Sequence, residues 1–157
     1  MTERAFSFLR VNQVSPKPRA TGLTEIRGPY YTPLGKRQLE DILETMGEYV
    51  DSLKFAGGSF SLMPRPVLVE LLKACHDHDV LVSTGGFLEY VLTQGPDAVS
   101  KYIEECKRVG FDIIELSCGF ITIPADDWLR LIERVKKAGL KAKPEIGPVW
   151  GWWRDTR

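Results

Sequence analysis

The sequence has no paired cysteines and no excess of charge of either sign. Its three cysteines, Cys75, Cys106 and Cys118, are odd in number, far apart and outside any CxxC motif. This pattern argues against both a disulfide framework and a cysteine-based zinc site. The 21 Lys and Arg residues balance 21 Asp and Glu residues, so the chain shows no overall electrostatic footprint for nucleic acid or an anionic membrane. Any anion site must be local.

Long apolar runs are missing as well. The longest stretches are only a few residues, and the opening segment "MTERAFSFLRVNQVSPKPRATG" has no hydrophobic signal-peptide core. We therefore expect neither a transmembrane span nor a secretory signal. Together with unpaired cysteines, this predicts a cytoplasmic location.

Short apolar runs alternate with longer segments of helical period, at a spacing of about thirty residues that matches one βα unit. With 157 residues in total, this predicts one domain. The predicted strands cover residues 23–27, 50–56, 80–84, 112–117 and 140–146. The predicted helices cover residues 36–49, 64–78, 95–110 and 124–139. Strands that alternate with helices pair in parallel through right-handed crossovers, which fits both an open doubly wound sheet and a (β/α)8 barrel.

Polar residues interrupt one face of several predicted strands. Lys54, Glu115 and Glu145 alternate with apolar neighbours, so they point to the opposite side of the sheet from those neighbours. Each lies shortly before a glycine-containing turn, at the end of the strand where barrels place their catalytic groups. Arg27 has the same position in the first strand. A solvated charge on an edge strand is the alternative for any one of them.

The turn "STGGF" follows the third predicted strand. It offers backbone N–H groups and small side chains beside a helix start, which predicts a cradle for a phosphate or sulfonate group at Ser83, Thr84, Gly85 and Gly86. Gly-Gly pairs are also common in ordinary βα turns, and that reading stays open.

Several segments are quite specific in combination. "LKFAGGS", "STGGF" and "KPEIG", within a match that runs in order over about residues 19–147, resemble the phosphosulfolactate synthase family, which includes a plant heat-stress-associated protein and fungal relatives. The resemblance implies a (β/α)8 TIM barrel. It also implies Mg2+-dependent addition of sulfite to phosphoenolpyruvate, the first step towards coenzyme M in archaea.

The implied chemistry suggests roles for the charged residues. Glu115 and Glu145 would be the oxygen ligands of Mg2+. Lys54 would stabilise the enolate-like species or deliver a proton to it. Arg27 and Lys143 would hold the phosphate, sulfite or carboxylate.

The first loop, "RGPYYTPLGKRQLED", looks like the fungal and plant branch of the family rather than the archaeal one. A eukaryote has no evident need for coenzyme M, so the substrate of such a protein stays open. A different phosphate-handling reaction on the same barrel shares these local features.

The chain ends after its fifth predicted strand, whereas eight βα units need roughly 240 residues. We expect residues 1–147 to be the N-terminal part of a barrel and residues 148–157 to be a tryptophan-rich tail outside the family pattern. The first and fifth strands would have unpaired edges. Such a sheet could stay open, pair with a second copy as a homo-oligomer, or be unstable.

Two functions follow as hypotheses. In the first, the chain is a lyase-type enzyme by ancestry that binds small anionic substrates and lacks catalysis as an isolated fragment. In the second, it is a non-catalytic stress-associated or interaction protein on the same fold. Retained Lys54, Glu115 and Glu145 favour the first hypothesis.

Overall fold

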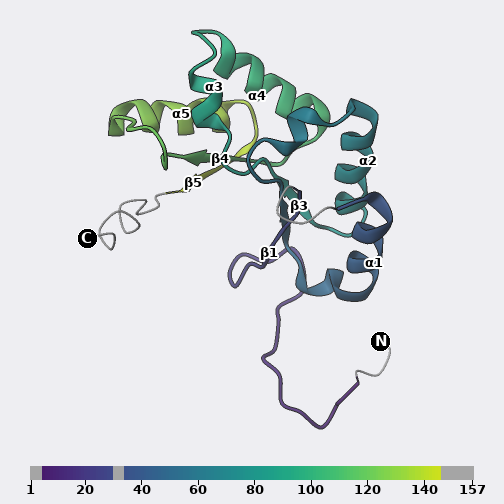
Figure 1. The fold of residues 1–157 in the computed structure, drawn as a ribbon. Helices are drawn as coiled ribbons and strands as arrows, with labels where there is room; N and C mark the ends of the chain where they lie inside the picture. Colours follow the sequence, from purple (N-terminus) through teal and green to yellow (C-terminus); the bar gives the residue numbers. More distant parts are fainter. Residues whose placement is uncertain (1–4, 30–33, 146–157) are drawn as a thin grey trace, which may run out of the picture.

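The computed structural model describes residues 5–29 and 34–145. Within them lies one five-stranded sheet in the order β1-β2-β3-β4-β5 (Figure 1). Every neighbouring pair is parallel. The strands are β1 (Glu25–Arg27), β2 (Ser52–Lys54), β3 (Leu81–Ser83), β4 (Ile113–Ser117) and β5 (Lys141–Glu145). All five lie at the positions predicted from the sequence, but each is shorter than predicted.

In the part of the chain that the structure describes, five α-helices and two 3-10 turns connect the strands. The elements are α1 (Lys36–Met46), η1 (Gly47–Tyr49), η2 (Ser59–Leu62), α2 (Arg65–His76), α3 (Leu88–Leu92), α4 (Ala98–Val109) and α5 (Ala125–Lys137). The four predicted helices are confirmed as α1, α2, α4 and α5. The sequence analysis missed α3, because a helix of five residues is too short to display a helical period.

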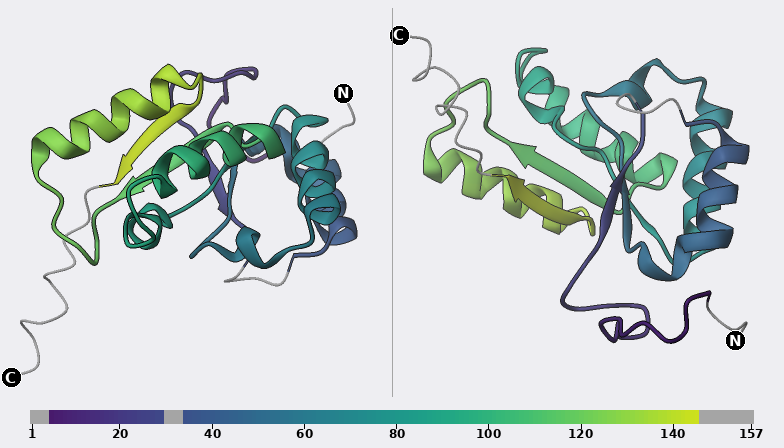
Figure 2. Two further views of the ribbon diagram at one scale, coloured as in Figure 1. Left: turned by 90° about the horizontal axis from the view of Figure 1, so that it is seen from above. Right: turned by 60° about the horizontal axis from the view of Figure 1, so that its bottom comes forward.

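The helices form an arc outside the strands in Figure 1, and the turned views in Figure 2 show the same row following the curve of the sheet. Leu53, Val82 and Ile114 are fully buried and belong to the hydrophobic core. The strand order is strictly sequential, whereas a doubly wound sheet reverses its order at a switch point. The arrangement therefore corresponds to part of a barrel.

Matching glycines end two of the helices. Gly110 follows α4 with a φ of 105°, and Gly139 follows α5 with a φ of 83°. Residues with side chains rarely adopt this left-handed conformation, which ends a helix and turns the chain towards the next strand. The similar sequences "KRVGFDII" and "KKAGLKAK" thus encode the same turn into β4 and β5.

No helix among the described residues is long and apolar enough to cross a membrane. The predicted boundary at residue 147 and the tryptophan-rich tail lie outside the described residues.

Candidate functional site

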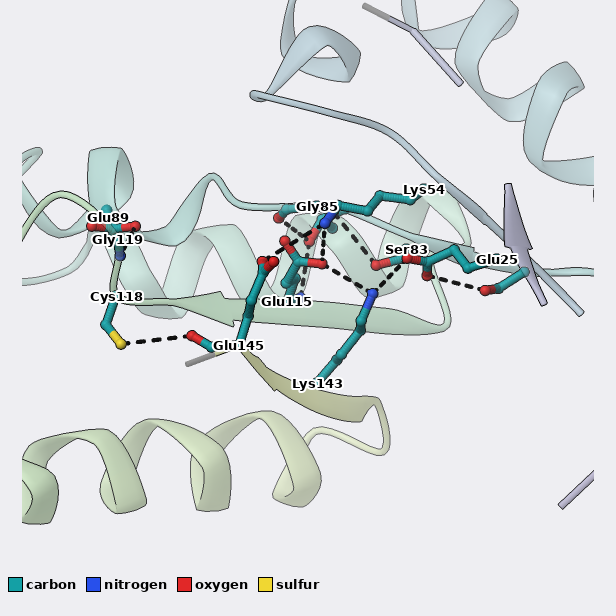
Figure 3. A network of polar contacts seen from close by, with 12 residues as sticks. Glu25, Lys54, Ser83, Gly85, Glu89, Glu115, Cys118, Gly119, Lys143 and Glu145 are labelled. Carbon is teal, nitrogen blue, oxygen red and sulfur yellow. Dashed lines mark hydrogen bonds and ion pairs between the residues drawn. The ribbon is translucent and has the colours of Figure 1, made fainter. Parts of the chain in front are cut away.

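Charged side chains from β2, β4 and β5 meet on the inner face of the sheet (Figure 3). The Nζ atom of Lys54 lies 2.8 Å from Oε2 of Glu115 and 3.7 Å from Oε2 of Glu145. The Nζ atom of Lys143 lies 3.1 Å from the same Glu115 oxygen. The structure thus brings together four of the residues that the sequence singled out, while their chemical roles stay predictions.

Strand alternation explains this convergence. Glu115 lies between the fully buried Ile114 and Leu116 in β4, so its side chain projects from the opposite face. In β5, Lys143 pairs in register with Glu115, and Glu145 pairs with Ser117. Equivalent positions on neighbouring parallel strands therefore carry their charges to the same side of the sheet.

Glu25 is a fifth member of this group, and the sequence analysis missed it. Its Oε1 atom accepts a hydrogen bond from Lys143 Nζ at 2.6 Å, and Oε2 accepts one from Ser52 Oγ at 3.0 Å. The contact joins β1 to β5. The same alternation rule, applied to "LTEIR", would have placed Glu25 on the face of Arg27. Glu25, Lys54, Glu115, Lys143 and Glu145 are called the polar cluster below.

The polar cluster combines three carboxylates with two ammonium groups. Glu115 is fully buried. Burial and the carboxylate of Glu145 raise the pKa of Glu115, against the opposing effect of Lys54 and Lys143. The neighbouring carboxyl group of Glu115 lowers the pKa of Glu145, and the two lysines lower it further. The two carboxyl groups are therefore coupled and titrate as a pair.

Lys143 stays charged. Burial lowers its pKa, but the carboxylates of Glu25 and Glu115 outweigh burial and raise the pKa overall. A cation fixed between two carboxylates can still attract a substrate oxygen that approaches from the open side of the sheet.

Three buried oxygens at the polar cluster have no hydrogen-bond partner among the described residues: Oε1 and Oε2 of Glu115 and Oγ of Ser117. Oε2 forms the ion pairs with Lys54 and Lys143, which leaves Oε1 of Glu115 and Oγ of Ser117. A Cβ atom on Gly86 would lie 3.1 Å from Ser117 Oγ and 3.5 Å from Glu115 Oε1. Gly86 therefore leaves room for a small group beside both oxygens. Buried polar atoms usually have partners, so this room is a candidate position for a ligand atom, and Ser117 joins the candidate site.

The other residues of the predicted phosphate cradle have different surroundings. Ser83 and Thr84 are fully buried. The Thr84 hydroxyl donates to the Gly85 carbonyl at 3.1 Å and accepts from the backbone N–H of Glu115 at 3.2 Å. Gly85 has a φ of 62°, and a Cβ there would lie 2.0 Å from the carbonyl oxygen of Phe55. Of these residues, Gly86 borders the two unpaired oxygens, and a role of the four in substrate binding stays a prediction.

Glu89 fixes the loop that follows β4, and it too was missed. Its carboxylate accepts hydrogen bonds from the backbone N–H groups of Gly119, Phe120 and Ile121 at 3.0, 2.5 and 2.8 Å. Burial raises the pKa of Glu89, but these three donors outweigh burial and lower it. Its sequence signal was an acidic residue inside the apolar stretch "FLEYVL".

Arg27 lies at the end of β1, where it pairs in register with Lys54 and is exposed. No contact of a bound anion tests its role in anion binding, which stays a prediction.

The predicted Mg2+ ligands could fill only part of the coordination shell of a metal ion. Within residues 5–29 and 34–145 there is no group of three or more His, Cys, Asp or Glu residues that could hold one. Mg2+ commonly takes one or two carboxylates and completes its shell with water and substrate oxygens. The unpaired Oε1 of Glu115, with the carboxylate of Glu145 nearby, meets that smaller requirement.

Fold and site together define a class of protein. The parallel, sequential sheet with helices outside it is part of a (β/α)8 barrel. Lys54 and Glu145 end strands β2 and β5, and the carboxyl ends of the strands are where barrel active sites are found. The family model for (2R)-phospho-3-sulfolactate synthase (ComA) matches residues 12–153. The chain belongs to this family.

Individual relatives agree with this assignment. The chain is 46% identical over 128 residues to the protein HEAT-STRESS-ASSOCIATED 32 of Arabidopsis thaliana, which covers 82% of this chain and 45% of the relative. It is 32% identical over 143 residues to phosphosulfolactate synthase of Methanothermobacter thermautotrophicus, which covers 91% of this chain and 54% of the relative. The enzyme of the same name from Methanocaldococcus jannaschii is 31% identical over 110 residues, covering 69% of this chain and 43% of the relative. The chain thus spans about half the length of these relatives.

Proposed function

We propose that this chain supplies one part of a phosphosulfolactate synthase-type site, which binds phosphoenolpyruvate and sulfite on the inner face of the sheet. One observation carries the proposal: Lys54 and Lys143 both lie within 3.1 Å of the buried Glu115 carboxylate, from strands on either side of it. Cations held in place beside a buried carboxylate suit a reaction in which negative charge develops on a small anion.

The reaction would proceed by addition. The sulfur of sulfite forms a bond to the methylene carbon of phosphoenolpyruvate, the electron pair of the C=C bond moves towards the carboxylate, and a proton then adds to the second carbon. The phosphate ester stays intact. Lys54 would donate that proton or neutralise the enolate-like species, while Lys143 and Arg27 would orient anionic oxygens.

Glu115 and Glu145 would hold a magnesium ion, with Oε1 of Glu115 as the available buried oxygen. When bound, the ion would supply positive charge to the developing enolate. The backbone of Gly86 and the hydroxyl of Ser117 would hold an anionic oxygen of the substrate. Because the chain spans about half the length of its relatives, we expect binding by this chain and turnover only in the complete barrel.

Calorimetric titration of the chain with phosphoenolpyruvate, with and without Mg2+, tests the proposal. We expect binding that Lys54→Met weakens by at least about tenfold, since a charge-assisted contact is lost. Lys137→Met, which removes an exposed lysine of α5, is the matched control. Equal binding by both variants, or no binding by the parent chain, would refute the proposal. Detection of phosphosulfolactate by phosphorus NMR in the presence of sulfite would extend it to catalysis.

A second function is favoured by the 46% identity to a protein named for heat stress. In this alternative, the chain keeps the fold and acts by binding another protein. Two results would support the alternative over the enzyme. The melting temperature of the chain would be the same with and without Mg2+ and phosphoenolpyruvate. The cellular heat-stress phenotype would be the same for the parent chain and for Lys54→Met.

A further inference from the structure

A cavity lies on the helix side of the sheet, lined by η2, α2, α3 and α4. Its volume is about 560 Å3, within the range of roughly 300–1,000 Å3 that is usual for small-molecule sites. None of the polar cluster lines it. The side chains that shape its inner wall are Phe60, Leu68, Phe87, Val91, Tyr102 and Phe111.

Aromatic rings fix the shape of this wall. The ring of Phe60 lies 5.1 Å from that of Phe111 and 5.4 Å from that of Phe87, both edge to face. It also stacks at 28° on Tyr102. Gly58 has a φ of 74°, and a Cβ there would lie 2.1 Å from the Phe87 ring, so this glycine allows Phe87 to cover the turn before η2. Rings held by one another form a preorganised surface for a flat apolar molecule.

The inner wall carries no charge near neutral pH. Burial raises the pKa of the Cys106 thiol to about 12. Burial also raises the pKa of the Tyr102 hydroxyl. Neither group would repel an anion.

The mouth of the cavity has unbalanced positive charge. Arg65 and Lys101 line it together with Glu105. Arg65 forms an ion pair with Glu105, which also binds Arg108. Lys101, in contrast, forms no ion pair with any residue that the structure describes. An exposed ammonium group above an apolar, aromatic wall suits a ligand with a flat body and one negative end.

We infer that this cavity binds a small aromatic carboxylate, with its rings against Phe60, Phe87 and Tyr102 and its carboxylate at Lys101. This site does not depend on the proposed synthase function, because it shares no residue with the polar cluster.

Calorimetric titration with 2-naphthoate tests the site. Ala98 lines the cavity and is partly buried, so Ala98→Phe fills part of it. We expect binding of 2-naphthoate to the parent chain at submillimolar concentration and at least tenfold weaker binding to Ala98→Phe. Val67→Phe adds the same ring at an exposed position of α2 outside the cavity and should bind like the parent. Equal loss in both variants, or no binding to the parent chain, would overturn the inference.

A charge test separates the two halves of the inference. Lys101→Gln should weaken the binding of 2-naphthoate by about threefold, which corresponds to the loss of an exposed ion pair. It should leave the binding of the neutral 2-naphthamide unchanged. Lys137→Gln is the control and should bind both probes like the parent. If Lys101→Gln leaves the binding of 2-naphthoate unchanged, the anionic part is wrong. If Ala98→Phe fails to fold, chemical-shift changes in the parent chain must map to α4 and η2, and changes elsewhere would overturn the site.

Discussion

The ammonium group of Lys54 lies 2.8 Å from Oε2 of Glu115, although the two residues belong to strands β2 and β4, which are separated by β3. The ion pair therefore spans the sheet on its inner face. Only 1% of the Glu115 side chain and 17% of the Lys54 side chain are exposed. Removing one partner leaves a poorly compensated buried group.

Lys54→Met should lower the free energy of unfolding by about 1–3 kcal/mol at neutral pH, less than for a fully enclosed pair because Lys143 still contacts Glu115. Urea denaturation measures this change. The double variant Lys54→Met/Glu115→Gln should recover part of the loss, because a neutral amide in place of the buried carboxylate needs no counter-ion. A double variant that is as unstable as the sum of the two single variants would contradict the coupling.

The adjacent glycines of the "STGGF" turn should respond differently to alanine. Gly85→Ala combines a left-handed φ of 62° with a Cβ 2.0 Å from a backbone oxygen, so we expect a loss of at least about 2 kcal/mol in unfolding free energy. Gly86→Ala places its Cβ at 3.1 Å from a side-chain oxygen, which costs less in stability. Gly86→Ala should instead weaken phosphoenolpyruvate binding. Melting curves and calorimetry on both variants give the comparison, and the reverse order of stability would be inconsistent with this geometry.

Glu89→Gln should loosen the loop after β4. A neutral amide offers one acceptor oxygen in place of the two that bind three N–H groups, so hydrogen exchange at Gly119–Ile121 should become faster. Because the folded protein lowers the pKa of Glu89 below 4.5, its stabilising effect is complete above pH 4.5 and is lost as the pH falls through the folded pKa. The stability difference from the parent should therefore shrink in acid. Glu104→Gln, at an exposed position of α4, is the control.

Much of the fold could be predicted because its signals are local. The 3.6-residue period in α1, α2, α4 and α5 and the short apolar runs between them determine the βα order. Parallel pairing then follows from the connections. The short α3 and the exact strand ends depend on tertiary contacts, which cannot be predicted from the composition or the hydrophobic period of the sequence.

The candidate site was predictable only in part. Alternation along a strand placed Lys54, Glu115 and Glu145 on one face, but their distances depend on the curvature of the sheet. Alternation would also have placed Glu25 on this face, but its contact with Lys143, 118 positions away in the sequence, depends on the fold. Glu89 stands out in the sequence as an acidic residue in an apolar stretch, but its partners could not be predicted, because they are backbone N–H groups, which every loop has.

The N-terminal segment should contribute to stability through Asp51. The carboxylate accepts hydrogen bonds from Arg19 Nη1 and from the backbone N–H of Thr24, both at 2.8 Å. The exposed fractions of the Arg19 and Asp51 side chains are only 3% and 9%. Asp51→Asn should therefore cost about 1–3 kcal/mol at neutral pH, while Asp41→Asn, exposed on α1, should cost little.

The pH dependence of this variant is a sharper test than its stability alone. Burial raises the pKa of Asp51, but the hydrogen bond from Thr24 and the Arg19 guanidinium outweigh burial and lower it below 3.8. The stabilisation is then complete above pH 3.8 and is lost as the pH falls through the lower, folded pKa, because the unfolded chain takes up its proton first. The difference between parent and Asp51→Asn, measured by urea denaturation from pH 7 to pH 3, should be constant at first and decline below about pH 4. A difference that stays constant over the whole range would mean that the charge of Asp51 does not stabilise the fold, and that only its hydrogen-bonding shape matters.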